Sequence, residues 1–126
     1  YVRKRFSAVG TLLLARSRVR LNAYNEDRTY LTTFFGGDDG VTCVALSWTW
    51  TAIPRTNLSV DLGWQRFDLR SGNNSPEDVR LQFRAQRDLR DDIFVNVRAW
   101  RNSRFATVSS QEYDENTISV GIGKRF

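Results

Sequence analysis

The chain has 126 residues, 40% of them hydrophobic and 26% charged, with a formal net charge of +5. It contains no histidine and only one cysteine, Cys43. A Ser–His–Asp triad, a histidine-ligated metal, a Cys–X–X–Cys metal site and an internal disulfide are therefore excluded. We expect no catalytic residues, no metal and no other cofactor, in a length that fits one domain (residues 1–126) or part of a larger one.

Apolar and polar residues alternate along the chain, which predicts β-strands rather than helices. In residues 79–86 every odd position is apolar and every even position is polar. We expect seven strands in chain order, at residues 2–13, 18–30, 41–52, 57–69, 78–88, 93–104 and 116–126. Each would have one polar and one apolar face. At about 11–13 residues they exceed the 5–6 usual in soluble sheets and suit a tilted strand that spans a membrane.

An internal repeat organises these strands. Apolar rows begin three residues after Arg16, Arg55 and Arg90, and short turns at residues 14–17, 53–56 and 89–92 alternate with long polar connections at 31–40, 70–77 and 106–115. The pattern predicts an all-β, antiparallel up-and-down meander, with the loop asymmetry of an outer-membrane β-barrel. Such barrels have even strand numbers. We therefore expect this chain to be the C-terminal part of a larger barrel, with at least one strand before Tyr1.

Two interpretations of the apolar face compete. In a soluble meander it would pack on a core, leaving an arginine-rich outer surface. In a transmembrane barrel it would contact lipid. The sequence contains no amphipathic helix or second sheet to cover this face, which favours the barrel in a Gram-negative outer membrane.

The tail residues 113–126 (YDENTISVGIGKRF) place Ile118, Val120 and Ile122 at every second position before the terminal Phe126. This tail resembles the C-terminal assembly signal of bacterial outer-membrane β-barrels, although Lys124 stands where that signal usually has an aromatic or apolar residue. The resemblance implies that the barrel-assembly machinery binds this strand. Together with residues 52–60 (AIPRTNLSV) and 101–103 (RNS), the tail is similar to the outer-membrane β-barrel proteins associated with PEP-CTERM/exosortase exopolysaccharide systems.

If the apolar rows face lipid, the alternate rows face the lumen. Guanidinium groups there would attract anions, and acidic sugars would find bidentate partners. Alternatively, the arginines pair with Asp61, Asp88 and residues of further strands, and fill a closed lumen. The lumen rows carry Arg3, Arg5, Arg18, Arg20, Arg80, Arg84 and Arg98, together with Asn22, Cys43, Asp61, Gln65, Gln82, Gln86, Asp88 and Asn96.

The lipid rows carry Trp48, Trp50, Trp64 and Phe83, which suit an interfacial aromatic belt or, in the soluble interpretation, a core. Arg66 and Arg101 continue these rows, where they would reach lipid phosphates. Acidic residues such as Glu26 gather in the long loops and at their edges. The segment Gly36–Gly40 (GGDDG) offers oxygen ligands for Ca²⁺, but it is also ordinary turn composition.

These patterns predict a passive channel or export conduit for anionic polysaccharide or small anions. Its expected partners are the lipid bilayer, lipopolysaccharide and other envelope proteins. The alternatives are a closed structural or docking barrel in an envelope assembly, or a soluble basic β-domain. Binding of single-stranded nucleic acid is disfavoured, because aromatic and arginine side chains alternate onto opposite faces.

Overall fold

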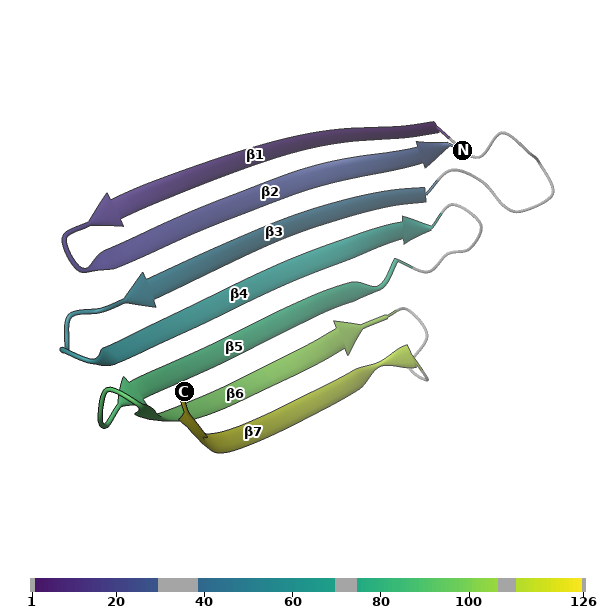
Figure 1. Cartoon of the computed structure of the whole chain (residues 1–126). Helices are drawn as coiled ribbons and strands as arrows, with labels where there is room; N and C mark the ends of the chain where they lie inside the picture. Colours follow the sequence, from purple (N-terminus) through teal and green to yellow (C-terminus); the bar gives the residue numbers. More distant parts are fainter. Residues whose placement is uncertain (1, 30–38, 70–74, 107–110, 126) are drawn as a thin grey trace.

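The computed structural model describes residues 2–29, 39–69, 75–106 and 111–125. They form one antiparallel sheet whose seven strands follow each other in chain order (Figure 1). The predicted all-β, up-and-down order is thereby confirmed. No helix among the described residues has the length and apolarity needed to cross a membrane. The strands are β1 (Val2–Leu14), β2 (Ser17–Thr29), β3 (Asp39–Trp50), β4 (Thr56–Leu69), β5 (Glu77–Asp88), β6 (Ile93–Phe105) and β7 (Tyr113–Lys124).

Two strands are shifted from the sequence prediction by two or three residues, and the other boundaries agree to within one residue. β3 runs from Asp39 to Trp50 rather than over 41–52, and β7 runs from Tyr113 to Lys124 rather than over 116–126. Backbone pairing continues past the apolar rows, since Asp39 is paired with Arg28 and Tyr113 with Arg104. A ladder of backbone hydrogen bonds does not require apolar side chains. A prediction that begins each strand at its first alternating apolar residue therefore places the starts of β3 and β7 too late.

The short turns lie where the sequence places them. In the turn between β3 and β4, the Thr56 amide donates to the Ile53 carbonyl at 3.1 Å, and Arg55 has a φ of 58°. Proline at the second position and a positive φ at the third are features of a type II turn, in which glycine usually occupies the third position. Arg55 also pairs with Asp91 of the next short turn, at 3.0 Å.

The register separates the sheet into an apolar face and a polar face. Paired residues project to the same side, so each row across the sheet has one character. One apolar row crosses all seven strands as Leu12, Val19, Trp48, Val60, Phe83, Ala99 and Ile118. The adjacent row on the polar face is Leu13, Arg18, Thr49, Ser59, Arg84, Arg98 and Ser119.

Nothing in the described part of the chain covers the apolar face. The chain exposes 9392 Å², whereas a compact domain of 14.6 kDa would expose about 6,900 Å². Val41 is the one buried hydrophobic residue among those described, while Leu62 and Leu81 at the centre of the apolar face are 44% and 46% exposed. Among the described residues, this face is therefore not packed on a core.

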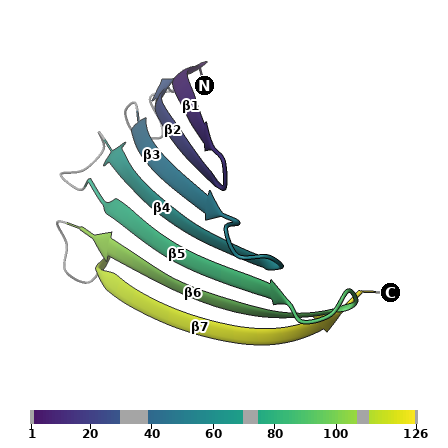
Figure 2. The same ribbon diagram turned by 90° about the vertical axis from the view of Figure 1, so that its left-hand side faces the viewer.

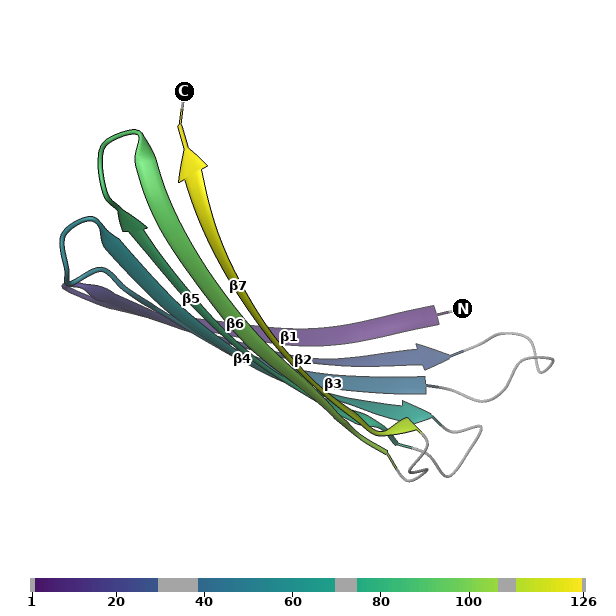
Figure 3. The same ribbon diagram turned by 90° about the horizontal axis from the view of Figure 1, so that it is seen from below.

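The sheet is open, and β1 and β7 are its edges (Figure 2). Viewed along its lower edge, the strands bend and the two ends of the sheet twist away from each other (Figure 3), as the right-handed twist of strands requires.

Candidate functional site

The polar face carries a hollow of about 630 Å³ near the short turns. Because this one hollow reaches across the five strands β2–β6, the polar face is the concave face of the sheet. It is lined by Arg18, Arg20, Ser47, Thr49, Asn57, Leu58, Ser59, Asp61, Arg84, Ala85, Gln86, Asn96, Val97 and Arg98.

The register brings four of the seven arginines predicted for the lumen to this hollow. Arg18 and Arg20 come from β2, Arg84 from β5 and Arg98 from β6. The strands between them carry short side chains, Thr49 and Ser59 in the Arg18–Arg84 row, and these leave the space open. Arg84 and Arg98 are directly paired across β5 and β6. Like charges placed directly opposite each other destabilise a sheet, so this pair costs stability in the absence of an anion.

Asp61 is the one acidic residue that lines the hollow. Its Oδ2 accepts from Arg84 Nη2 at 3.0 Å, and its Oδ1 accepts from Ser47 Oγ at 2.7 Å. Within the described residues, Arg18, Arg20 and Arg98 have no ion pair. Four guanidinium groups therefore face one carboxylate, and three positive charges remain uncompensated. Such a concave, donor-rich surface attracts anions.

The opposite, long-loop end of the polar face is partly compensated by ion pairs. Glu26 is 2% exposed and accepts from Arg28 Nε at 2.7 Å and from Arg3 Nη2. Arg104 binds Asp78 with two hydrogen bonds of 2.6 and 2.8 Å. Glu26 lies within β2, three residues before the strand ends at Thr29. Ion pairs are thus concentrated at the long-loop end, whereas in the described part of the chain Arg84 alone has one among the arginines of the hollow.

The remaining polar-face residues are distributed along this surface. Asp88 pairs with Arg125 at 3.1 Å and accepts from Gln86 at 3.3 Å, so its partner is not one of the arginines predicted for the lumen. Arg80 Nε donates to Asn102 Oδ1 at 3.0 Å. The register also places Arg5, Asn22, Cys43, Gln65, Gln82 and Asn96 on this face.

The residues predicted to face lipid all lie on the apolar face. Trp48 and Trp50 stack with ring centroids 6.4 Å apart. The positions of Trp64, Phe83, Ile118, Val120 and Ile122 follow from the same register. Ile118, Val120 and Ile122 are each at least 70% exposed on β7. Phe126 lies outside the described residues.

Arg66 and Arg101 lie at the loop-side border of the apolar face. Each binds a carboxylate of its own sheet: Arg66 binds Asp68 at 3.0 Å, and Arg101 binds Asp114 at 3.4 Å. These ion pairs would compete with lipid phosphates for the same guanidinium groups.

The glycine-rich segment 36–40 is only partly described. Residues 36–38 lie outside the described residues, and Asp39 and Gly40 belong to β3. In the part of the chain that the structure describes, no three acidic or cysteine side chains gather into a group that could hold a metal ion.

Comparison with protein families, curated proteins and solved structures finds no match to this chain. Its chemistry is therefore inferred from its own residues. The hollow presents hydrogen-bond donors and positive charge, which can bind an anion.

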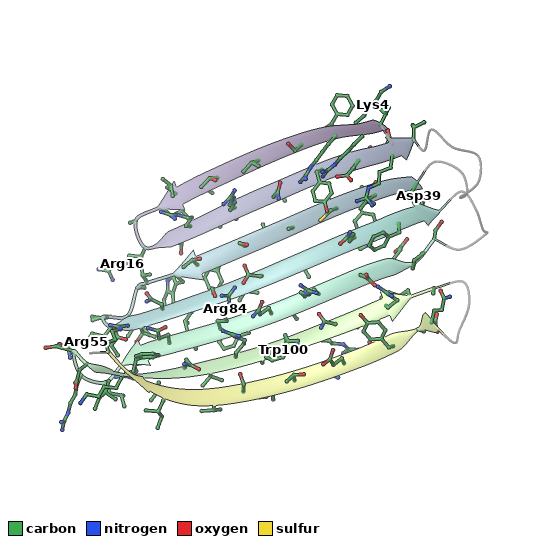
Figure 4. The ribbon with its side chains drawn as sticks, turned by 45° about the vertical axis from the view of Figure 1, so that its right-hand side comes forward. Lys4, Arg16, Asp39, Arg55, Arg84 and Trp100 are labelled. Atoms are coloured by element: carbon green, nitrogen blue, oxygen red, sulfur yellow. The ribbon has the colours of Figure 1, made fainter. Side chains whose placement is uncertain are left out.

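Sequence reasoning missed Trp100, the fourth tryptophan. It lies on the polar face of β6, on the strand next to Arg84 of β5, and is half-buried (Figure 4). In β6 the odd positions, such as Val97 and Ala99, form the apolar row. The even position of Trp100 is therefore the signal that could have placed it on the polar face.

Proposed function

We propose that this chain forms part of a transmembrane β-barrel in the outer membrane of a Gram-negative bacterium, and that its concave face lines a passage for anions. The observation that carries this proposal is the contrast between the two faces. One face is apolar and uncovered across seven strands, and the other holds an arginine-lined hollow. In a barrel, lipid would cover the apolar face and water would fill the hollow on the polar face, so that each face meets a solvent of matching polarity.

The strand lengths fit a bilayer. The strands have 12–14 residues, so each is about 40–46 Å long at about 3.3 Å per residue. Tilted by about 40°, such a strand spans about 30–35 Å, enough for the apolar band of about 25 Å that outer-membrane barrels present to lipid.

The apolar band also slopes as strand tilt requires. In β1 the band runs from Leu14 to Phe6, whereas in β6 it runs from Ile93 to Ala99. Ala99 lies in the row of Leu12, and Leu14 lies in the row of Val97. From β1 to β6, both borders of the apolar band therefore shift toward the short turns, by about one residue for each strand crossed. With strands about 4.8 Å apart, this slope corresponds to a tilt of about 35–40°, the range found in barrels.

Closing the ring requires further strands. β1 and β7 run in the same direction, because six antiparallel steps separate them. An antiparallel ring therefore needs an odd number of additional strands between these two edges. Such strands would pair with the open edges of β1 and β7. This fits the proposal that the chain is the C-terminal part of a barrel related to the PEP-CTERM/exosortase-associated family, inserted by the assembly machinery into a membrane of lipid and lipopolysaccharide.

A closed structural or docking barrel is the second candidate. It is favoured by the long-loop end of the polar face, where Glu26 with Arg3 and Arg28, and Asp78 with Arg104, tie the strands together and compensate their charge. A lumen filled in this way throughout would conduct no ions. The uncompensated hollow at the other end favours the channel.

The proposal is tested by expressing the whole barrel of which this chain is proposed to be a part, behind a secretion signal in a Gram-negative host. We expect it in the outer-membrane fraction, resistant to carbonate and urea, and conducting with anion selectivity when the purified protein is added to planar bilayers. Membrane retention without conductance would favour the structural barrel. Recovery as a folded protein that is monodisperse without detergent would refute the membrane assignment.

A further inference from the structure

A second hollow, of about 220 Å³, lies beside the first on the polar face. It is lined by Arg80, Gln82, Arg98, Trp100 and Asn102, all from β5 and β6. Arg98 lines both hollows. The two therefore form one continuous surface, with an indole ring at the end away from Arg18 and Arg20.

The polar groups around Trp100 are mostly hydrogen-bond donors. The carbonyl oxygen of Asn102 accepts from Arg80 Nε at 3.0 Å, which leaves the amide NH₂ of Asn102 and the terminal NH₂ groups of Arg80 available. Among the described residues, Gln82, Arg98 and Trp100 have no side-chain hydrogen bond. A ligand that fits must supply acceptors and an apolar surface together.

We propose that this second hollow is a binding subsite for an acidic sugar unit, one that carries a carboxylate on a polyhydroxylated ring. This inference rests on the proposed function, since it assigns the substrate class of the same passage. The carboxylate would bind a guanidinium group in a bidentate manner. The hydroxyl groups would pair with the amides of Gln82 and Asn102. The C–H face of the sugar ring would lie on the indole of Trp100, whose π-face is negative.

A nucleotide is the other ligand class with a flat ring and an anionic group. A nucleotide base can stack on tryptophan just as a sugar ring can. The polar edge of a base, however, presents hydrogen-bond donors together with acceptors. Donors dominate this hollow, so they match the acceptors of a sugar acid better than the mixed edge of a base. The shared residue Arg98 then places the next anionic group within the larger hollow, where Arg84 is directly paired with it. A short chain of acidic sugars would occupy both hollows.

Calorimetric titration of the same purified barrel in detergent with trigalacturonate tests the proposal without requiring conductance. Maltotriose provides a neutral sugar of equal length, and adenosine monophosphate represents the nucleotide class. We expect trigalacturonate to bind and maltotriose to bind at least tenfold more weakly. Trp100→Ala should weaken trigalacturonate binding about tenfold, and Trp100→Phe should retain part of the affinity. Trp64→Ala, on the opposite face, should leave it unchanged.

Circular dichroism of each variant shows whether the sheet has folded, and Trp100→Phe keeps the test informative if Trp100→Ala does not fold. Equal binding by trigalacturonate and maltotriose would overturn the proposal, as would full affinity in both Trp100 variants. Tighter binding of adenosine monophosphate would assign the hollow to nucleotides. The proposed function fails by a different measurement, the absence of anion-selective conductance, which leaves these affinities unaffected.

Discussion

Arg84 and Asp61 form the one ion pair among the residues that line the larger hollow. They are held on adjacent strands, with Arg84 Nη2 3.0 Å from Asp61 Oδ2. Ser47 fixes the other carboxylate oxygen at 2.7 Å. Both partners are partly exposed, with 50% of the Arg84 side chain and 32% of the Asp61 side chain accessible. The pair therefore contributes little to folding but sets the net charge of the hollow.

Replacing Asp61 by Asn should increase the preference of the passage for anions. The substitution removes the one carboxylate from a hollow with four arginines and frees Arg84 to face the solution. We expect the reversal potential in a salt gradient to move further toward the anion limit, with the single-channel conductance for chloride raised up to about twofold. The measurement is planar-bilayer recording.

Asp91→Asn is the matched control. Asp91 lies in a short turn, pairs with Arg55 and has 95% of its side chain exposed. Its loss removes the same charge at a distance from the hollow and should leave selectivity unchanged. Equal shifts in the two variants would mean that overall charge, rather than the hollow, sets ion preference.

Glu26 should matter for stability rather than for transport. It is nearly inaccessible, and it holds Arg3 of β1 and Arg28 of its own strand. Glu26→Gln keeps the size of the side chain but removes the charge that both arginines share. We expect the thermal midpoint in detergent to fall by several degrees, with selectivity unchanged, because the site lies at the compensated end of the face. Glu112→Gln, at an exposed carboxylate, should leave the midpoint in place.

The sequence predicts on which face of the sheet each strand residue lies, because side chains alternate between the two faces with a period of two. The register adds only which residues of neighbouring strands lie side by side. Alternation alone places Arg84 on the polar face and Trp48 on the apolar face. Alternation does not predict the curvature that gathers Arg18 and Arg98 from distant strands around one hollow. Nor does it predict that Glu26 is buried, because its partner Arg3 comes from another strand.

A close contact on β7 offers a test of the register. Gly123 is paired with Phe94, and a Cβ added at Gly123 would lie 2.3 Å from Phe94 Cζ. The Phe94 ring thus lies over the glycine, with the guanidinium carbon of Arg125 5.1 Å from its centroid. Gly123→Ala should force the ring away and destabilise the sheet by about 1–3 kcal/mol, measured by urea unfolding in lipid vesicles.

Two companion variants separate the clash from a general effect of alanine. At Gly10 an added Cβ would have no atom within 4 Å, so Gly10→Ala should be neutral. Adding Phe94→Leu to Gly123→Ala should recover part of the loss, because the smaller side chain leaves room for the methyl group. A neutral Gly123→Ala would show that the Phe94 ring moves aside at little cost.

The environment of the apolar face is tested by a pair of neighbouring substitutions on β5. Leu81 lies at the centre of the apolar face and is 46% exposed, while Gln82 lies at the same depth on the polar face. If lipid covers the apolar face, Leu81→Arg should destabilise the folded protein in vesicles by about 2–4 kcal/mol, because a charge would enter hydrocarbon. Gln82→Arg should cost less than about 1 kcal/mol, because its side chain would meet water. In a sheet surrounded by water, both positions would accept arginine with equally small losses. Equal urea midpoints for the two variants would therefore contradict the membrane assignment. A large loss of stability in Leu81→Arg alone would support contact between the apolar face and lipid.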